Sequence, residues 1–483
     1  MYITICRCTL AGMKKHYYHL RIQAYMLSLA FICLAFFTTV SAQTYSPPLG
    51  SKTIYHPDSS NDKDAPQGYI PFFINHVSRH GARHLTNYKE LSLLNKFLQN
   101  AADSGALSSD GERLERMIQL LLSIEKKYTP GSLTKIGEEE QYGIGKRMGE
   151  NYPSAVRLPD DCINVTVTKE LRTEQSADNF LNGLSYSTKK DTLVCLNRKG
   201  IDSIHLRFYS LAPTYLAFEK KGSWKKFIDQ LESSDTIQTI NHTIVERFFS
   251  PAFTIRLEQG QFKEIATAST FTSLLYAAAS ITAGLKSEIK MSGLKPDDVN
   301  IFLLLKPDEV KCLALVDGAE DFLVKGPAID PEGIQVRDAV PLLIDFIQTS
   351  DKHLAENKKG ADLRFAHGET IAPIAALMEL EGADVPATNI FRYEDVWKIE
   401  RIMCYSGNIQ WVFYKKQNGK KEKDTSTYLV KILFNESPVH IPVPTTQFPY
   451  YRWEDVRRFY MDKLQRLGVN QEEDMYQYLM QLK

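Results

Sequence analysis

A histidine between two arginines is the first feature of this chain that is equipped for chemistry. The motif Arg79-His80-Gly81-Ala82-Arg83 follows a mostly apolar run at residues 69–77. Arginine forms forked hydrogen bonds to phosphate oxygens, and neutral imidazole can attack phosphorus to give a phosphohistidine. Two arginines beside the reacting group would also neutralise charge in the transition state. The motif therefore predicts phosphoryl chemistry with His80 as the nucleophile; the alternative is a surface turn with incidental charges.

A second cluster, His367-Gly368-Glu369, follows a predicted strand at residues 361–366 and opens a predicted helix at 370–380. Attack by His80 requires an acid that can be protonated while the imidazole is neutral. Burial beside a phosphate would raise the pKa of Glu369 and suit it to that role. Alone, the cluster is also typical of a capped helix start with an acidic residue near the helix dipole.

Strands and helices alternate around both clusters, which predicts an α/β fold: a mostly parallel sheet flanked by helices. Ligands bind such sheets at the carboxyl ends of the strands, where both clusters stand. The predicted strands are residues 69–77, 163–168, 204–208, 361–366, 408–414 and 428–434, with an Asn418-Gly419 turn before the last. The predicted helices include residues 88–102, 173–184, 224–231, 272–283, 337–349 and 370–380.

Helical periodicity dominates from residue 211 to 325, and we interpret this region as an inserted, mainly helical cap. The predicted division is a signal peptide at 1–42, a first part of the α/β core at 43–210, the cap at 211–325 and a second part of the core at 326–483.

The N-terminal segment has the character of an export signal. Four basic residues and no acidic one precede an apolar stretch at about 24–40, and Val40-Ser41-Ala42 supplies small residues for cleavage. We therefore expect a periplasmic or secreted protein that is not inserted in a membrane after cleavage. An uncleaved anchor is the alternative, and Met13 or Met26 is an alternative start.

The two clusters together resemble the histidine phosphatase superfamily, in its acid phosphatase and phytase branch, whose signature is Arg-His-Gly-x-Arg. His84 and Leu85 depart from the aromatic residue and proline often found there, which affects loop shape. The His-Gly-Glu sequence is similar to the His-Ala-Glu of multiple inositol polyphosphate phosphatases, whereas many other members have His-Asp. The resemblance implies that His367 binds the phosphoryl group and that Glu369 protonates the leaving oxygen.

A third match to the family is Arg172, which follows the predicted strand at 163–168 and opens the helix at 173–184. The resemblance implies a third phosphate-binding arginine, although an isolated arginine at a helix start is usually a surface residue. Lys89 and Lys325 are candidates for distal phosphates, as are the cap lysines; an ordinary surface position is the alternative. The expected site is His80, Glu369 and His367 for catalysis, and Arg79, Arg83, Arg172 and His367 for phosphate binding.

Composition narrows the partners and cofactors. Basic and acidic residues number 58 each, so no global positive charge indicates nucleic acid. The histidines show no metal-ligand spacing, and we expect neither a metal nor another cofactor. Removal of the signal leaves Cys162, Cys195, Cys312 and Cys404, which either form disulfides or are small buried residues.

The leading hypothesis is a monomeric phosphomonoester hydrolase that forms a phosphohistidine and acts on a small polyanion. The resemblance implies inositol hexakisphosphate (phytate) and other inositol polyphosphates. A general acid phosphatase for sugar phosphates and other small monoesters is the first alternative. A non-catalytic phosphate-binding protein on the same fold is the second, although a binding protein needs no proton donor such as Glu369. A phosphoglycerate mutase fits less well, since its relatives lack a large cap and an export signal.

Overall fold

The computed structural model describes residues 46–57, 65–156, 162–188, 197–330, 333–417 and 428–483. The predicted signal peptide and the Asn418-Gly419 turn lie outside these residues. Within them, no helix has both the length and the apolar character needed to cross a bilayer. Cys312 and Cys404 are free thiols, while Cys195 and the side chain of Cys162 fall outside the description.

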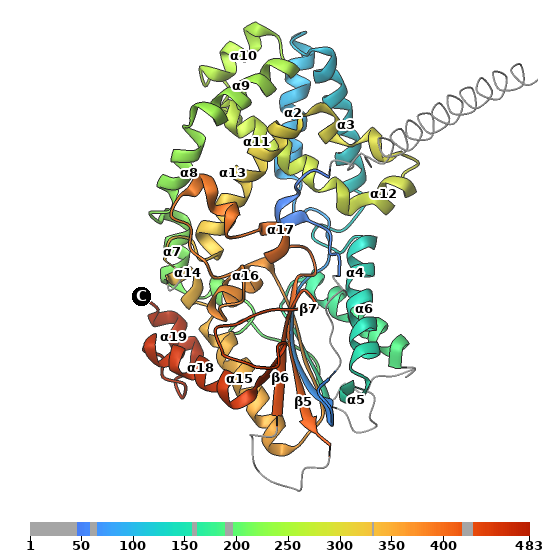
Figure 1. The fold of residues 1–483 in the computed structure, drawn as a ribbon. Helices are drawn as coiled ribbons and strands as arrows, with labels where there is room; N and C mark the ends of the chain where they lie inside the picture. The colour runs from blue at the N-terminus through green and yellow to red at the C-terminus, as the bar shows by residue number, and fades with distance from the viewer. Residues whose placement is uncertain (1–45, 58–64, 157–161, 189–196, 331–332, 418–427) are drawn as a thin grey trace, which may run out of the picture. The chain divides into compact units, whose positions relative to one another are not determined.

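A mixed sheet forms the centre of the fold (Figure 1). The strand order is β3-β2-β4-β1-β5-β6-β7, and β8 pairs with β6. Strands β3, β2, β4 and β1 are parallel, whereas β5 and β6 extend the sheet in antiparallel fashion. The strands are β1 (Tyr69–Arg79), β2 (Cys162–Val167), β3 (Asn197–Ile201), β4 (Gly360–Ala366), β5 (Asn408–Lys416), β6 (Tyr428–Phe434), β7 (Ser437–Pro438) and β8 (Tyr450–Arg452). The predicted α/β class with a mostly parallel sheet is confirmed.

Helices cover both faces of the sheet because successive side chains of a strand point to opposite sides. On β1, Ile74 packs in an apolar cluster with α4 (Lys135–Asn151) and α6 (Leu171–Thr188). Its neighbour Phe73 packs in a second cluster with helices of the other face. These are α15 (Val340–Glu356), α16 (Gly368–Leu377) and α18 (Trp453–Arg466).

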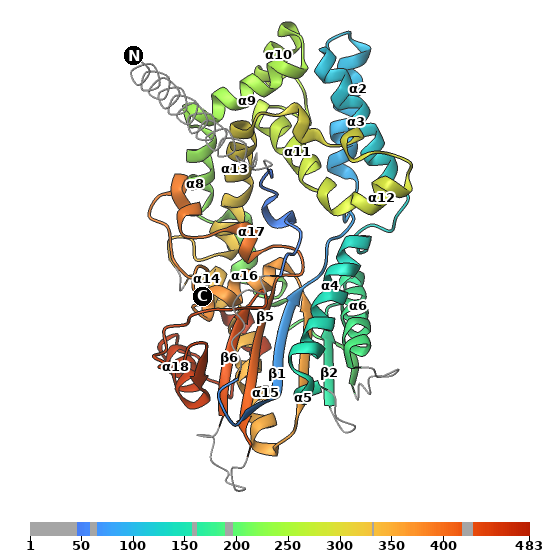
Figure 2. The ribbon, with the colours of Figure 1, turned by 45° about the vertical axis from the view of Figure 1, so that its right-hand side comes forward.

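A separate layer of helices lies beyond the carboxyl end of β1 (Figures 1 and 2). Its apolar cluster joins residues 91–124 with residues 244–314. The layer thus combines α2 (Lys89–Asp103) and α3 (Ser109–Glu125) with later helices, although the sequence analysis assigned these two helices to the core. The later ones are α9 (Asp235–Phe248), α10 (Pro251–Glu258), α11 (Ala268–Ser280), α12 (Lys286–Met291) and α13 (Pro307–Lys325). The cap boundaries at 211 and 325 stay predictions.

Several short helices complete the described chain. Tyr215 of α7 and Leu231 of α8 pack in the same cluster as the core helices α15 and α16. The remaining bounds are α5 (Pro153–Val156), α7 (Pro213–Lys221), α8 (Lys225–Glu232), α14 (Ile334–Arg337), α17 (Ile399–Ile402) and α19 (Met475–Gln481).

One predicted strand is wrong. Residues 204–208 form a turn, and the strand of this region is β3, which ends at Ile201. The alternation of Ile204, Leu206 and Phe208 mimics a strand. The side chain of Asp202, however, accepts a hydrogen bond from the backbone N–H of His205 at 2.9 Å, and such a bond favours a turn over an extended chain.

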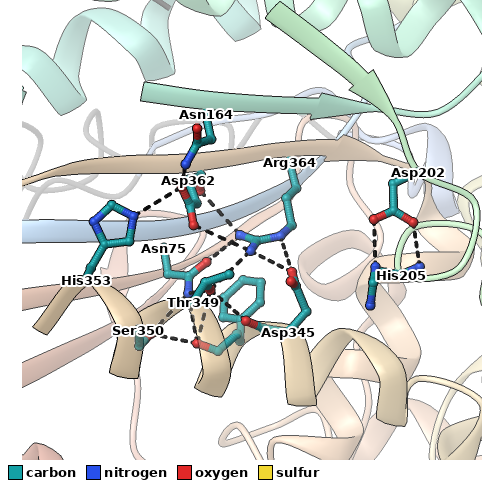
Figure 3. A network of polar contacts seen from close by, with 11 residues as sticks. Asn75, Asn164, Asp202, His205, Asp345, Thr349, Ser350, His353, Asp362 and Arg364 are labelled. Carbon is teal, nitrogen blue, oxygen red and sulfur yellow. Dashed lines mark hydrogen bonds and ion pairs between the residues drawn. The ribbon is translucent and has the colours of Figure 1, made fainter. Parts of the chain in front are cut away.

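A buried polar network fastens α15 to the sheet (Figure 3). Nε of Arg364 on β4 donates to Asp345 of α15 at 2.7 Å. On the same strand, Asp362 accepts from Asn164 of β2 at 2.5 Å and lies 3.6 Å from His353 of α15. Buried charges are costly unless every partner is present, so the network resists shifts of β4. That strand ends at Ala366, directly before His367.

Candidate active site

The loop that follows β1 is held by its backbone. The N–H of His80 donates to Ala366 at the end of β4, and the carbonyl oxygen of His80 accepts from the N–H of Ser406, each at 3.0 Å. Ser406 adopts a left-handed conformation, with φ of 56°, and its hydroxyl donates to the carboxylate of Glu140 at 3.0 Å. Glu140 also accepts from the N–H of Ala82 at 2.9 Å. Three separate parts of the chain therefore fix the position of His80.

Gly81 is required by a close approach to α4. A Cβ atom at this position would lie 2.3 Å from the carbonyl oxygen of Gly137. A Cβ atom on Gly137 would in turn lie 2.0 Å from the carbonyl oxygen of Ala82. Both contacts are with backbone atoms, which cannot turn aside as a side chain could. The pair of glycines lets the motif pack directly on the first turn of α4.

The imidazole of His80 is buried and has one defined tautomer. Its Nδ1 lies 2.9 Å from the carbonyl oxygen of Gly81. A carbonyl oxygen only accepts, so Nδ1 carries the hydrogen and Nε2 keeps a lone pair. Burial, followed by the charges of Arg79 and Arg172, lowers the pKa of His80 well below its usual value. The ring is therefore neutral and suited to nucleophilic attack through Nε2.

Three arginines supply charged donors around this ring. The Nε atoms of Arg79, Arg83 and Arg172 are buried and have no hydrogen-bond partner among the described residues. Buried donors without partners are uncommon, and those on guanidinium groups suit a tetrahedral oxyanion. Arg79 is anchored by Nη1, which donates to the carbonyl oxygens of Ser51 and Met403.

His367 is the N-cap residue of α16, and its ring centroid is 5.5 Å from that of His80. Nη2 of Arg172 lies 3.3 Å from Nδ1 of His367, and an arginine only donates. Nε2 of His367 therefore carries the hydrogen, which points to the hydroxyl of Thr168 at 3.0 Å. Burial and the charge of Arg172 lower the pKa of His367 to about 3. His367 thus accepts a hydrogen bond from Arg172 and helps to orient its guanidinium group.

Glu369 lies in the first turn of α16, with its side chain 39% exposed. Burial raises the pKa of Glu369, but the charges of Lys325 and then His367 outweigh it and lower this pKa to about 2. The raised pKa expected for Glu369 concerns the site with a bound phosphate and stays a prediction. The sequence analysis did not foresee the contact with Lys325, whose Nζ lies 3.9 Å from Oε1 of Glu369 although the residue belongs to another helix.

The other lysines that were candidates for distal phosphates are exposed. Lys89 is the first residue of α2. The cap lysines lie on α7 and α8: Lys220, Lys221, Lys225 and Lys226. Contacts of these residues with distal phosphates stay predictions. Among the residues described, no group of three or more His, Cys, Asp or Glu side chains is arranged to hold a metal.

Sequence reasoning missed two charged residues beside the arginines. Glu170 accepts from Arg207 at 2.5 Å and from Arg172 at 3.2 Å, and so holds two guanidinium groups together. Glu170 lies two residues before Arg172, and this proximity in sequence could have identified it as a partner of that arginine. Arg207 was hidden in the segment that was misread as a strand.

Comparison with known proteins agrees with this fold. Residues 73–222 match the histidine phosphatase superfamily (branch 2). The multiple inositol polyphosphate phosphatase of Bifidobacterium longum, solved with inositol hexasulfate, is 21% identical with a TM-score of 0.76, over 85% of this chain and 97% of that one. A phytase from D. castellii is 15% identical with a TM-score of 0.60, over 90% and 92% of the two chains. No curated protein sequence matches the chain.

The similarity to the histidine phosphatase superfamily (branch 2) is thus established for residues 73–222. The matched segment contains His80, the three arginines, β2 and most of β1. The structural similarity extends over most of the chain and shows that its fold is shared with an inositol polyphosphate phosphatase and a phytase.

Proposed function

We propose that the protein is a phosphomonoesterase that removes phosphates from inositol polyphosphates, including inositol hexakisphosphate, through a phosphohistidine on His80. The observation that carries the proposal is the set of three buried, unpartnered Nε donors beside a neutral imidazole with Nε2 free to attack. A receptor for phosphate would have use for the arginines, but not for an oriented nucleophile and a carboxylic acid nearby.

In the proposed first step, Nε2 of His80 attacks phosphorus and the bond to the leaving oxygen breaks. Glu369 gives its proton to that oxygen, and the arginines neutralise the charge on the other phosphate oxygens. In the second step a water molecule attacks the phosphohistidine. Glu369 takes a proton from this water, and inorganic phosphate leaves with His80 restored as the neutral ring.

The acidity of Glu369 has to change during this cycle. With a pKa of about 2, Glu369 is mostly ionised at neutral pH. The negative charge of a bound phosphate would raise that pKa and favour the protonated form for the first step. Departure of the alcohol and transfer of the phosphoryl group would favour the carboxylate again for the second.

The substrate part of the proposal rests on similarity and charge. Related folds include an enzyme solved with inositol hexasulfate, a polyanion of the same shape class as phytate. We propose that Lys89 contacts a distal phosphate of the substrate. We also propose that the protein is exported and monomeric.

The test is a substrate panel at equal ionic strength, with a strong chelator present throughout. Inositol hexakisphosphate should have a higher kcat/KM than sugar phosphates, and quenched reactions should contain acid-labile, base-stable phosphoprotein. Equal kcat/KM values would favour the general acid phosphatase. Binding without hydrolysis of any substrate would favour the binding protein, and activity that depends on a divalent ion would contradict the mechanism.

A further inference from the structure

Lys325 is the last residue of α13 and lies between two carboxylates. Its Nζ is 2.5 Å from Oδ1 of Asp321, one turn earlier on the same helix, and 3.9 Å from Oε1 of Glu369 on α16. The lysine side chain is only 17% exposed and that of Asp321 only 15%. A buried ammonium keeps its charge only if it is paired, and here the close pair with Asp321 provides that partner.

This arrangement differs from that of a ligand for a distal phosphate. Such a ligand must offer its ammonium to solvent, whereas the Lys325 ammonium already faces two carboxylates. Asp321 is fixed by the helix that it shares with Lys325, so it directs the ammonium towards Glu369. The nearer carboxylate acts as the anchor, and the farther one is left open to solvent and substrate on its remaining side.

We propose that Lys325 is a positioning residue for Glu369: held by Asp321, its ammonium orients the Glu369 carboxylate and favours the ionised form. The inference rests on the proposed role of Glu369 as proton donor. It assigns Lys325 to the proton-transfer machinery instead of to distal phosphate binding.

Other charged groups also face Glu369 and must be considered. His367 and Arg79 both favour the ionised form of the Glu369 carboxylate. Tyr209 and Arg172 lie within electrostatic range. On α13, Asp321 and Glu320 carry negative charges, and both interact electrostatically with the Lys325 ammonium. After burial itself, Lys325 has the largest effect on the pKa of Glu369, so its removal should be felt there first.

The consequence is a specific pH dependence. The first step needs Glu369 protonated, so kcat/KM for a poor leaving group falls as pH rises through the pKa of Glu369. Loss of the Lys325 charge raises this pKa. The protonated form of Glu369 then persists to higher pH, and the alkaline limb of the kcat/KM profile moves to higher pH. An aryl phosphate with a good leaving group needs little protonation and should show no such shift.

The experiment compares the pH profiles of Lys325→Met and Lys325→Arg with wild type, on inositol hexakisphosphate and on an aryl phosphate. We expect the methionine variant to shift the limb for inositol hexakisphosphate upward by about one pH unit, the low end for an opposite charge at this distance. The arginine variant should retain most of the wild-type profile. Lys311→Met is the matched control, since Lys311 lies on the same helix with its side chain 67% exposed.

An unmoved limb in Lys325→Met would overturn the inference. If KM for inositol hexakisphosphate alone then rises, Lys325 is a distal phosphate ligand; if KM is also unchanged, it is only structural. Should Lys325→Met misfold because Asp321 is left unpaired, the double variant Lys325→Met/Asp321→Asn removes both charges and should show the same shift. Phosphohistidine labelling of the wild type separates this outcome from failure of the proposed function, which would abolish labelling altogether.

Discussion

Nδ1 of His80 lies 2.9 Å from the carbonyl oxygen of Gly81, the next residue in the chain. The contact places the ring hydrogen on Nδ1 and so assigns the lone pair to Nε2. Because it is a bond to the neighbouring backbone, the tautomer is set by the same loop that packs on α4 through Gly137. The loop conformation that lets Gly81 pack against Gly137 therefore also sets the orientation of the His80 ring.

Replacement of His80 by alanine should abolish turnover. We expect kcat to fall by about 10³-fold or more, because the covalent route is lost. Radioactive phosphate should no longer be trapped on the protein in an acid-labile, base-stable form. The thermal unfolding midpoint, measured alongside, should stay close to wild type, and near-normal activity in a folded variant would show that His80 is not the nucleophile.

Replacement of Glu369 by glutamine should slow hydrolysis of inositol hexakisphosphate by about 10²-fold, the usual scale of general acid catalysis. An activated aryl phosphate should be affected much less, since its leaving oxygen needs little protonation. Parallel measurements of kcat on the two substrates test this difference. An equal loss on both would mean that Glu369 serves only the first turn of α16.

Glu140 is expected to stabilise the backbone of the loop that carries His80. Its carboxylate accepts from the N–H groups of Tyr55 and Ala82 and from the hydroxyl of Ser406. A glutamine must turn its NH₂ towards one of these donors, so Glu140→Gln should lower the free energy of unfolding by about 2 kcal/mol. Urea denaturation measures the loss. Glu139→Gln, at the exposed neighbouring position, is the control, and equal stability of the two variants would contradict the prediction.

His76 should make stability fall in acid. It is fully buried, and neither ring nitrogen is bonded to any residue that the structure describes. Burial, with the charge of Arg364, lowers its pKa from 6.5 to about 3. Between these values the unfolded chain binds a proton that the folded chain does not, so stability is lost as pH falls. At pH 4.5 the loss would be about 3 kcal/mol.

His76→Leu removes this titration. The unfolding midpoint of the leucine variant should therefore decline less between pH 7 and 4.5 than that of wild type. His56→Leu, at an exposed position, should retain the wild-type decline. Identical slopes for wild type and His76→Leu would show that another buried group controls the acid response.

The parts of the site that sequence could predict are those in which function and local order coincide. Residues 79–83 and 367–369 each follow a strand, and the two strands, β1 and β4, are neighbours in the sheet. Because both motifs were placed at strand ends, the sequence predicted that they lie at the same edge of the sheet. The predicted boundaries of β1, β4, β5 and β6 differ from the observed ones by at most two residues.

The contacts that tune these residues could not be predicted, because they join distant parts of the chain. Lys325 beside Glu369, and Glu140 beneath Ala82, depend on how helices pack and not on any spacing in the sequence. The strand predicted at 204–208 failed for the opposite reason. There a local hydrogen bond from the backbone N–H of His205 to the carboxylate of Asp202 prevailed over an alternating apolar pattern.

The pairing of β1 also has a consequence for synthesis of the chain. Its partners, β4 and β5, begin at Gly360 and Asn408. At about 5–20 residues per second, a ribosome needs roughly 15–60 s to pass from the end of β1 to the end of β4. For that time an apolar strand has neither of these partners, and such edges invite aggregation. Truncation of the chain before residue 360 should therefore yield insoluble protein.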